Sequence, residues 1–361
     1  MIYENTVILS EAKNLKRGFG GKYMNYQDIL DEFKKSLPKD CQWWPEFFYH
    51  FTDAHNAASI IDQGWIYSRA KADKESVMAN DNASKVVIET TNSENKIYGR
   101  LYFRPLTPTQ YHNEGFKPEG VRNKDINASC PIPIFFLLSV EKTMQLEGVK
   151  FAERGISGNR HNIQSGEEEF AKLNFSKIYH NGFYDSKTNG DIKEYRQSEV
   201  ICEGGFPVQP TVRVIMCRSN AERETLLYLL KRYSLRVYEA YKKIIMYKPS
   251  QKMFCGNGIF IKEVSVVDNS ISLELNSKKL RVKNSDDEVP FSVKIEVTYI
   301  GANGQSLYFS EGETQMNYCT VENIGMKLDS IPNCTKVLVK VKFDEEVMYE
   351  NELVIADDVI W

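Results

Sequence analysis

The change of sequence pattern near residue 255 most constrains how this chain can fold. After Cys255-Gly-Asn-Gly258, long runs alternate strictly between apolar and polar residues, as in Phe291-Ser-Val-Lys-Ile-Glu-Val-Thr-Tyr299. Such alternation is typical of antiparallel strands with one buried face, and turn signals such as Gly301-Ala-Asn-Gly304 separate the runs. Residues 258–361 are therefore predicted to form an all-β, immunoglobulin-like sandwich.

The segment before this boundary mixes helix and strand signals. Residues 1–46 are predicted to be an N-terminal extension with one helix at 26–36, and residues 47–255 a separate α+β domain. Helical spacing over 219–246, with Ser219 and Glu222 as a capping box, predicts a long helix that closes this domain. Strands are predicted at 46–52, 100–104, 132–140, 148–151 and 193–202.

Charge separates the two parts as well. Residues 258–361 carry 10 Lys and Arg against 18 Asp and Glu, so the net charge of −3 combines an acidic sandwich with a mildly basic remainder. A polyanion would meet the basic part, including the lysines and arginines of the 219–246 helix, although a solvated helix face is the more usual explanation for those residues.

Several functional classes find no support in the sequence. The longest apolar run, Ile132 to Val140, is too short to cross a bilayer, and the first residues lack a secretory signal pattern. Seven scattered cysteines without a C-x-x-C pair indicate neither a disulfide framework nor a zinc site, so we expect a cytoplasmic protein without a metal. No G-x-G-x-x-G or P-loop motif occurs.

Two short segments put polar side chains into apolar runs. The first is Tyr49-His50-Phe51-Thr52, followed by a helix that Asp53 or Asn56 could cap and Gly64 would end. The second is Arg196-Gln197-Ser198-Glu199-Val200. If 193–202 is one strand, Arg196 and Ser198 share one face and Gln197 and Glu199 the other. A glutamate just before Val-Ile-Cys would normally lie in solvent, so its position calls for a reason.

Read in order with Leu101-Tyr102-Phe103-Arg104-Pro105, these segments resemble the DarT family of NAD-dependent ADP-ribosyltransferase toxins, over about residues 47–205. The resemblance implies an ADP-ribosyltransferase fold of two small packed sheets. It also implies single-stranded DNA as substrate, with the same transfer to RNA as the alternative, and an antitoxin partner. A binding module that retains this scaffold without activity is a second hypothesis from another class.

The resemblance also implies roles for individual residues. Glu199 would be the catalytic carboxylate, and His50, Phe51, Thr52, Ser59 and Tyr67 would hold NAD. Apart from the resemblance, Tyr102 could stack on the nicotinamide or a base, with packing as the alternative, and a cation such as Arg104 would hold the pyrophosphate. The loop of about 152–198, with Asn159, Arg160 and His161, would read the substrate. The family's arginine ahead of the Tyr-Phe strand is replaced by Lys85, and Arg69, Arg100 or Arg104 could supply that charge.

The chemistry agrees with a carboxylate in this place. Cleavage of the nicotinamide glycosidic bond builds positive charge on the ribose, and a fixed carboxylate stabilises such charge. The same group can accept the proton of an attacking base nitrogen. The alternative for His50 is a histidine at the edge of the core bonded to the backbone, and for Glu199 a half-buried strand residue paired with Arg196 or Lys193.

Overall fold

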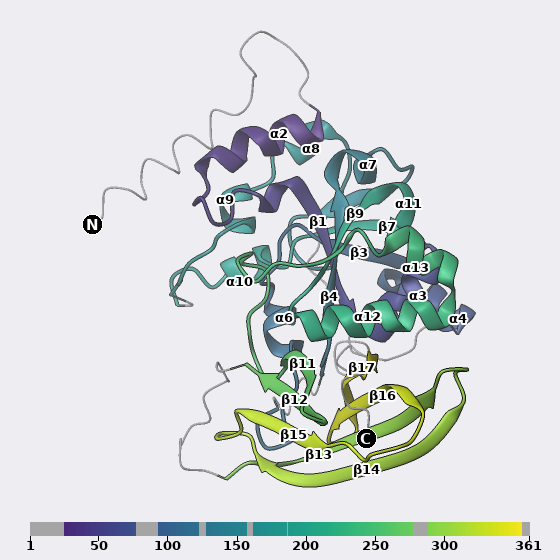
Figure 1. The fold of residues 1–361 in the computed structure, drawn as a ribbon. Helices are drawn as coiled ribbons and strands as arrows, with labels where there is room; N and C mark the ends of the chain where they lie inside the picture. Colours follow the sequence, from purple (N-terminus) through teal and green to yellow (C-terminus); the bar gives the residue numbers. More distant parts are fainter. Residues whose placement is uncertain are drawn as a thin grey trace.

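The computed structural model describes residues 25–76, 93–122, 128–156, 162–185, 187–276 and 288–355. Asn159, Arg160, His161 and Lys85 lie outside these residues. The two largest hydrophobic cores of the described residues lie in separate parts of the structure, one around a sheet with helices on it and one between two C-terminal sheets. Figure 1 shows the C-terminal sheets stacked at one end of the molecule, with helix α12 lying across them.

The first unit is built on an eight-stranded sheet of order β10-β9-β4-β1-β3-β7-β5-β6. Its strands are β1 (Phe47–Asp53), β3 (Tyr98–Tyr102), β4 (Pro133–Ser139), β5 (Lys150–Ala152), β6 (Ile163–Gln164), β7 (Glu199–Glu203), β9 (Val212–Cys217) and β10 (Ile245–Tyr247). A separate pair joins β2 (Trp65–Tyr67) to β8 (Gly205–Pro207).

One pairing holds the two halves of the large sheet together. Strands β1 and β3 share only the position Tyr49↔Tyr102, whereas β1 and β4 pair over seven positions. The prediction of two small packed sheets was therefore wrong as stated, because two four-stranded halves meet in one sheet. The two halves are joined at this single position next to His50, so the junction between them lies at the candidate site.

The β2–β8 pair crosses β3 closely because two glycines allow it. A Cβ on Gly205 would lie 2.1 Å from the Ile66 carbonyl oxygen, and one on Gly99 would lie 2.6 Å from the Gly205 Cα. Gly205 also has φ +126°, a backbone conformation that only glycine adopts readily. The crossing therefore packs β8, which follows β7 in the chain, against β3, one of the strands of the site.

Helices cover the sheet. They are α2 (Tyr26–Phe33), α3 (Ala54–Gln63), α4 (Arg69–Glu75), α6 (Pro108–Asn113), α7 (Val140–Met144), α8 (Glu167–Phe170), α9 (Phe175–Ile178), α10 (Ile192–Tyr195), α11 (Val208–Thr211), α12 (Asn220–Tyr233) and α13 (Leu235–Tyr241). Ile29, Leu30 and Phe33 of α2 belong to the core of this sheet. From Tyr26 onward, the segment predicted as an extension thus packs as part of the first unit.

Two sequence predictions are corrected here. The predicted helix 219–246 is α12 and α13, separated by an extended Ser234 (φ −165°, ψ 128°), and then strand β10. The predicted strand 193–202 begins only at Glu199, because residues 192–195 form α10 and the Ser198 hydroxyl closes the turn onto the Tyr195 carbonyl at 2.6 Å. The expected sharing of strand faces between Arg196 and Ser198 therefore does not occur.

The C-terminal unit consists of two antiparallel sheets that enclose a common core. One sheet has the order β11 (Ile261–Val267), β12 (Ser270–Leu275) and β15 (Asn323–Lys327). The other has the order β14 (Ser306–Asn317), β13 (Pro290–Gly301), β16 (Cys334–Phe343) and β17 (Glu346–Val354). The predicted alternation is present in β13, where every second residue from Phe291 to Tyr299 is buried.

Helix α12 connects the two units through polar contacts. The Ser219 side chain caps the helix by accepting the Glu222 N–H at 3.1 Å, and its hydroxyl donates to the Ile261 carbonyl at 2.7 Å. Farther along, the Tyr349 hydroxyl donates to Glu224 at 2.8 Å. The predicted cap at Ser219 is confirmed, and it joins the helix to the first C-terminal strand.

Candidate active site

The site is built where β1, β3 and β7 lie side by side. Register places Tyr49, Tyr102 and Glu199 opposite one another on three neighbouring strands, so their side chains leave the same face of the sheet. His50 and Thr52 alternate to the other face, beside Phe136. The two segments singled out in the sequence are thus brought together, but from opposite faces around the β1–β3 junction.

Glu199 is held firmly at the start of β7. It is 3% exposed, and one carboxylate oxygen accepts the Ile156 N–H at 2.8 Å. The other oxygen lies 3.9 Å from an Arg100 guanidinium nitrogen. The Asn95 amide donates to the Ile156 carbonyl at 2.8 Å, so residue 156 is held on both sides. A buried carboxylate with a nearby cation and a backbone donor is well oriented for electrostatic work.

The Glu199 carboxylate affects the pKa of the neighbouring Tyr102. Burial, and after it the neighbouring Glu199 carboxylate, raises the pKa of the Tyr102 hydroxyl to about 12, while a hydrogen bond to Thr109 and the charge of Arg100 oppose the rise. The phenol therefore stays protonated at physiological pH. Its half-buried ring lies beside the acid and is able to pack against a planar group.

His50 has a defined tautomer. Its Nδ1 lies 3.2 Å from the Arg100 carbonyl oxygen, and because a carbonyl only accepts, Nδ1 must carry the proton. Burial lowers the pKa of His50 to about 4, so the ring is neutral near pH 7. Neutral imidazole with a protonated Nδ1 presents Nε2 as an acceptor, which suits a sugar hydroxyl.

Three other residues predicted to hold NAD lie on β1, α3 and β2. Thr52 is 9% exposed on β1, and Ser59 lies half-buried on α3. Tyr67 on β2 is parallel to Trp65, with ring centroids 6.2 Å apart, and the Lys71 ammonium lies 4.5 Å from its ring centroid. Asp53 is the N-cap of α3, as the sequence suggested, and accepts the His55 N–H at 3.0 Å.

The position of Arg104 favours a structural role over the predicted phosphate contact. Its side chain is buried, donates to the Pro105 carbonyl at 2.9 Å and to the His180 carbonyl, and lies 4.7 Å from the Trp44 ring centroid. Burial lowers the pKa of the Arg104 guanidinium to about 9. Arg100, one of the other arginines considered from the sequence, is the one beside Glu199.

Sequence reasoning missed the partners that position the acid. The Ile156 backbone, which contacts Glu199, and Asn95, which holds Ile156, carry no motif, and only the fold brings them to this place. Among the described residues, no cluster of three or more His, Cys, Asp or Glu could hold a metal ion. No helix in the same ranges is long and apolar enough to cross a bilayer.

A single oriented carboxylate beside an arginine and a tyrosine suits chemistry at a ribosyl carbon. The protein is an NAD-dependent ADP-ribosyltransferase, an enzyme for which NAD is the substrate that is cleaved. The family model described as "ssDNA thymidine ADP-ribosyltransferase, DarT" matches residues 49–247, more than half of the chain. The chain belongs to the DarT family, as the resemblance implied.

Solved structures give distant likenesses. Thermus sp. 2.9 DarT in complex with ADP-ribosylated ssDNA is 18% identical, covers 57% of this chain and 96% of its own, and has a TM-score of 0.46. The same protein in complex with NAD+ is 17% identical, with coverages of 60% and 98% and a TM-score of 0.44. Thermosipho africanus DarTG in complex with ADP-ribose is 13% identical, with coverages of 62% and 54% and a TM-score of 0.44. No curated protein matches the chain in sequence. The family assignment rests on the family model alone.

Proposed function

We propose that this chain is a toxin that transfers ADP-ribose from NAD to a thymine base of single-stranded DNA. The observation that carries the proposal is the buried Glu199 carboxylate, oriented by the Ile156 N–H and lying 3.9 Å from Arg100, in a chain of the DarT family. The family model's description names thymidine of single-stranded DNA as the acceptor.

In the proposed reaction, the bond between the ribose C1′ and the nicotinamide nitrogen breaks and nicotinamide leaves with the bonding electrons. A ring nitrogen of the base then forms the new bond to C1′. Glu199 stabilises the positive charge on the ribose and accepts the proton that the base nitrogen loses. Nicotinamide leaves as a neutral molecule and no oxidation state changes, so the transfer needs no oxidant or reductant.

We assign the binding roles from the side-chain settings. Nε2 of His50 accepts a hydrogen bond from a ribose hydroxyl, with Thr52 beside it on β1, and the Tyr102 ring packs on the nicotinamide. Arg100 takes over the cationic role predicted for Arg104, because Arg100 is partly exposed and lies 3.9 Å from Glu199 whereas Arg104 is buried. Phe51, Ser59 and Tyr67 remain proposed NAD contacts, and Asn159, Arg160 and His161 proposed contacts to the DNA.

An enzyme that modifies DNA endangers the cell that makes it, so the proposal includes an antitoxin that reverses the modification or blocks the site. The acidic C-terminal unit, which we propose is an immunoglobulin-like sandwich, offers a docking surface of opposite charge to the first unit.

The test is transfer of label from NAD to homopolymers of each base, in DNA and in RNA. We expect label on thymine-containing DNA, and on no other base or sugar. Label on RNA alone would replace DNA by RNA as the substrate, and label on polypeptide alone would indicate a protein acceptor. Absence of transfer from correctly folded protein to any acceptor would refute the proposal in favour of a binding module.

A further inference from the structure

A groove lies at the β10 edge of the large sheet, away from the residues assigned above. It has a volume of about 540 Å³ and is bounded by α12, α13 and β10. Its polar lining consists of Arg223, Lys242, Lys243 and Lys248, together with Tyr238 and Tyr247. Three apolar side chains complete it. We call this the β10 groove.

The β10 groove is suited to a polyanion. Four of its nine lining residues are cations and none is a carboxylate. Arg223 is fixed at its base by donation to the Ile245 carbonyl at 3.0 Å, while Lys243 and Lys248 are exposed at its rim. Lys242 is the exception, because it pairs with Glu239 at 2.6 Å outside the lining. Cations interleaved with tyrosines are the combination that binds single strands, through phosphates and stacked bases.

One register row of the sheet leads from this groove toward the catalytic centre. Met246 pairs with Met216, Met216 with Phe135, and Phe135 with Phe51, so all four side chains share the face that carries Glu199. Met246 and Phe51, at the two ends, are half-buried, and Phe254 covers the middle with its ring centroid 5.4 Å from that of Phe135.

The distance between the β10 groove and Glu199 suits a short stretch of nucleic acid. Five strand-to-strand steps separate β10 from β7, which is about 24 Å at the usual spacing of neighbouring strands. About seven stacked nucleotides at roughly 3.4 Å each would cover that distance. A strand whose base reaches Glu199 can therefore place its flanking phosphates in the β10 groove.

We propose that the β10 groove is a second binding site for the single-stranded nucleic-acid substrate, which holds the phosphate backbone several nucleotides from the modified base. This inference rests on the proposed function. It predicts that the enzyme prefers long strands to short ones of the same sequence, because short strands reach only the catalytic centre.

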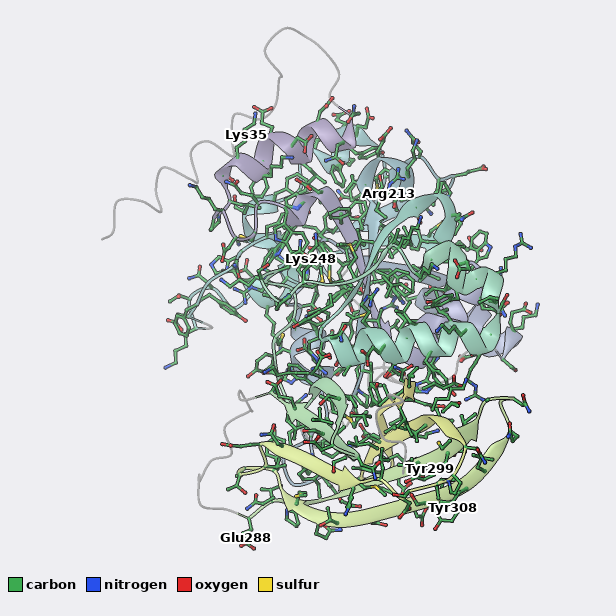
Figure 2. The ribbon with its side chains drawn as sticks, viewed as in Figure 1. Lys35, Arg213, Lys248, Glu288, Tyr299 and Tyr308 are labelled. Atoms are coloured by element: carbon green, nitrogen blue, oxygen red, sulfur yellow. The ribbon has the colours of Figure 1, made fainter. Side chains whose placement is uncertain are left out.

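The test uses the full chain with Lys243→Glu and Lys248→Glu combined. The matched control combines Lys35→Glu and Lys39→Glu, two exposed lysines with the same charge change on the N-terminal segment. Lys35 and Lys248 are well separated in Figure 2. Fluorescence anisotropy without NAD measures affinity for labelled DNA of about 20 nucleotides and of about 4 nucleotides across a salt series.

We expect the groove variant to bind the long strand at least about tenfold more weakly than wild type, with a salt slope shallower by about 1.4 for two lost phosphate contacts. Its affinity for the short strand and its transfer to that strand should match those of the control. The inference would be overturned if the groove variant and the control bound the long strand equally well. It would also be overturned if the groove variant lost the same affinity for the long strand and for the short strand. If the groove variant binds DNA normally but no longer binds an acidic protein partner, the groove serves that partner instead. Wild-type protein that binds DNA but transfers no ADP-ribose would refute the proposed function and leave the binding result standing.

Discussion

Acidification should destabilise this protein through His50, and by a calculable amount. Burial lowers the pKa of His50 to about 4 in the folded chain, whereas an unfolded histidine titrates near 6.5. The unfolded chain therefore binds this proton first as the pH falls. The stability that depends on neutral His50 is fully present above pH 6.5 and is lost between pH 6.5 and 4.

The total is about 3 kcal/mol, of which about 2 kcal/mol is lost by pH 5. Urea unfolding at pH 7 and pH 5 measures it, with His50→Asn as the variant that cannot titrate. Other histidines titrate in both proteins, so the pH-dependent loss in wild type should exceed the loss in the variant by about 2 kcal/mol. NAD affinity in wild type should change little through His50 over the same range, since the folded ring stays neutral.

Equal pH-dependent losses in wild type and His50→Asn would refute the reasoning, because they would mean that His50 is not desolvated. A wild-type NAD affinity that follows a pKa near 6.5 would contradict it in a second way. It would show that the bound imidazole protonates as a solvated one does.

Other substitutions separate structural from binding residues. Glu114→Ala should cost about 3–5 kcal/mol in urea unfolding, because the fully buried carboxylate accepts the Cys255 and Gly256 N–H groups at 2.8 and 2.7 Å and lies beside Arg218; a loss below about 1 kcal/mol would contradict this. Arg104→Lys should lower the free energy of unfolding by about 2 kcal/mol and leave NAD affinity unchanged. Arg100→Lys should weaken NAD binding in calorimetry and leave the free energy of unfolding unchanged. Identical profiles for the two would remove the distinction between them. Ser219→Ala should cost about 1–2 kcal/mol in thermal melts, through the lost cap of α12 and the lost bond to Ile261, and an unchanged melting temperature would count against that contact.

Local signals in the sequence predicted the parts of the site that depend on one segment. Strand β1, the capping of α3 by Asp53 and its end at Gly64 follow from alternation and capping chemistry. The family resemblance added Glu199. The groups that position that acid could not be predicted, because Ile156, which contacts it, and Asn95, which holds Ile156, are 43 and 104 residues away from it in the chain and come together only after the sheet forms.

The errors have physical causes too. The strand predicted at 193–202 was shortened by α10, whose last turn is closed by the Ser198 hydroxyl, and hydroxyl-to-backbone bonds of this kind compete with strand pairing. The last residues of the helix predicted at 219–246 form β10 instead, because residues 245–247 pair with β9 and sheet pairing overrides local helical spacing. Arg104 was predicted to bind the pyrophosphate, but its buried guanidinium donates hydrogen bonds to backbone carbonyls instead.

The central claim is that Glu199 carries the transfer of ADP-ribose. Glu203 offers a matched control, because it lies on the same strand and face but is exposed at the other end of β7. We predict that Glu199→Gln lowers the rate of label transfer from NAD to single-stranded DNA by about 100-fold or more, while Glu203→Gln transfers at close to the wild-type rate. Equal rates for the two variants, with both proteins folded, would contradict the account.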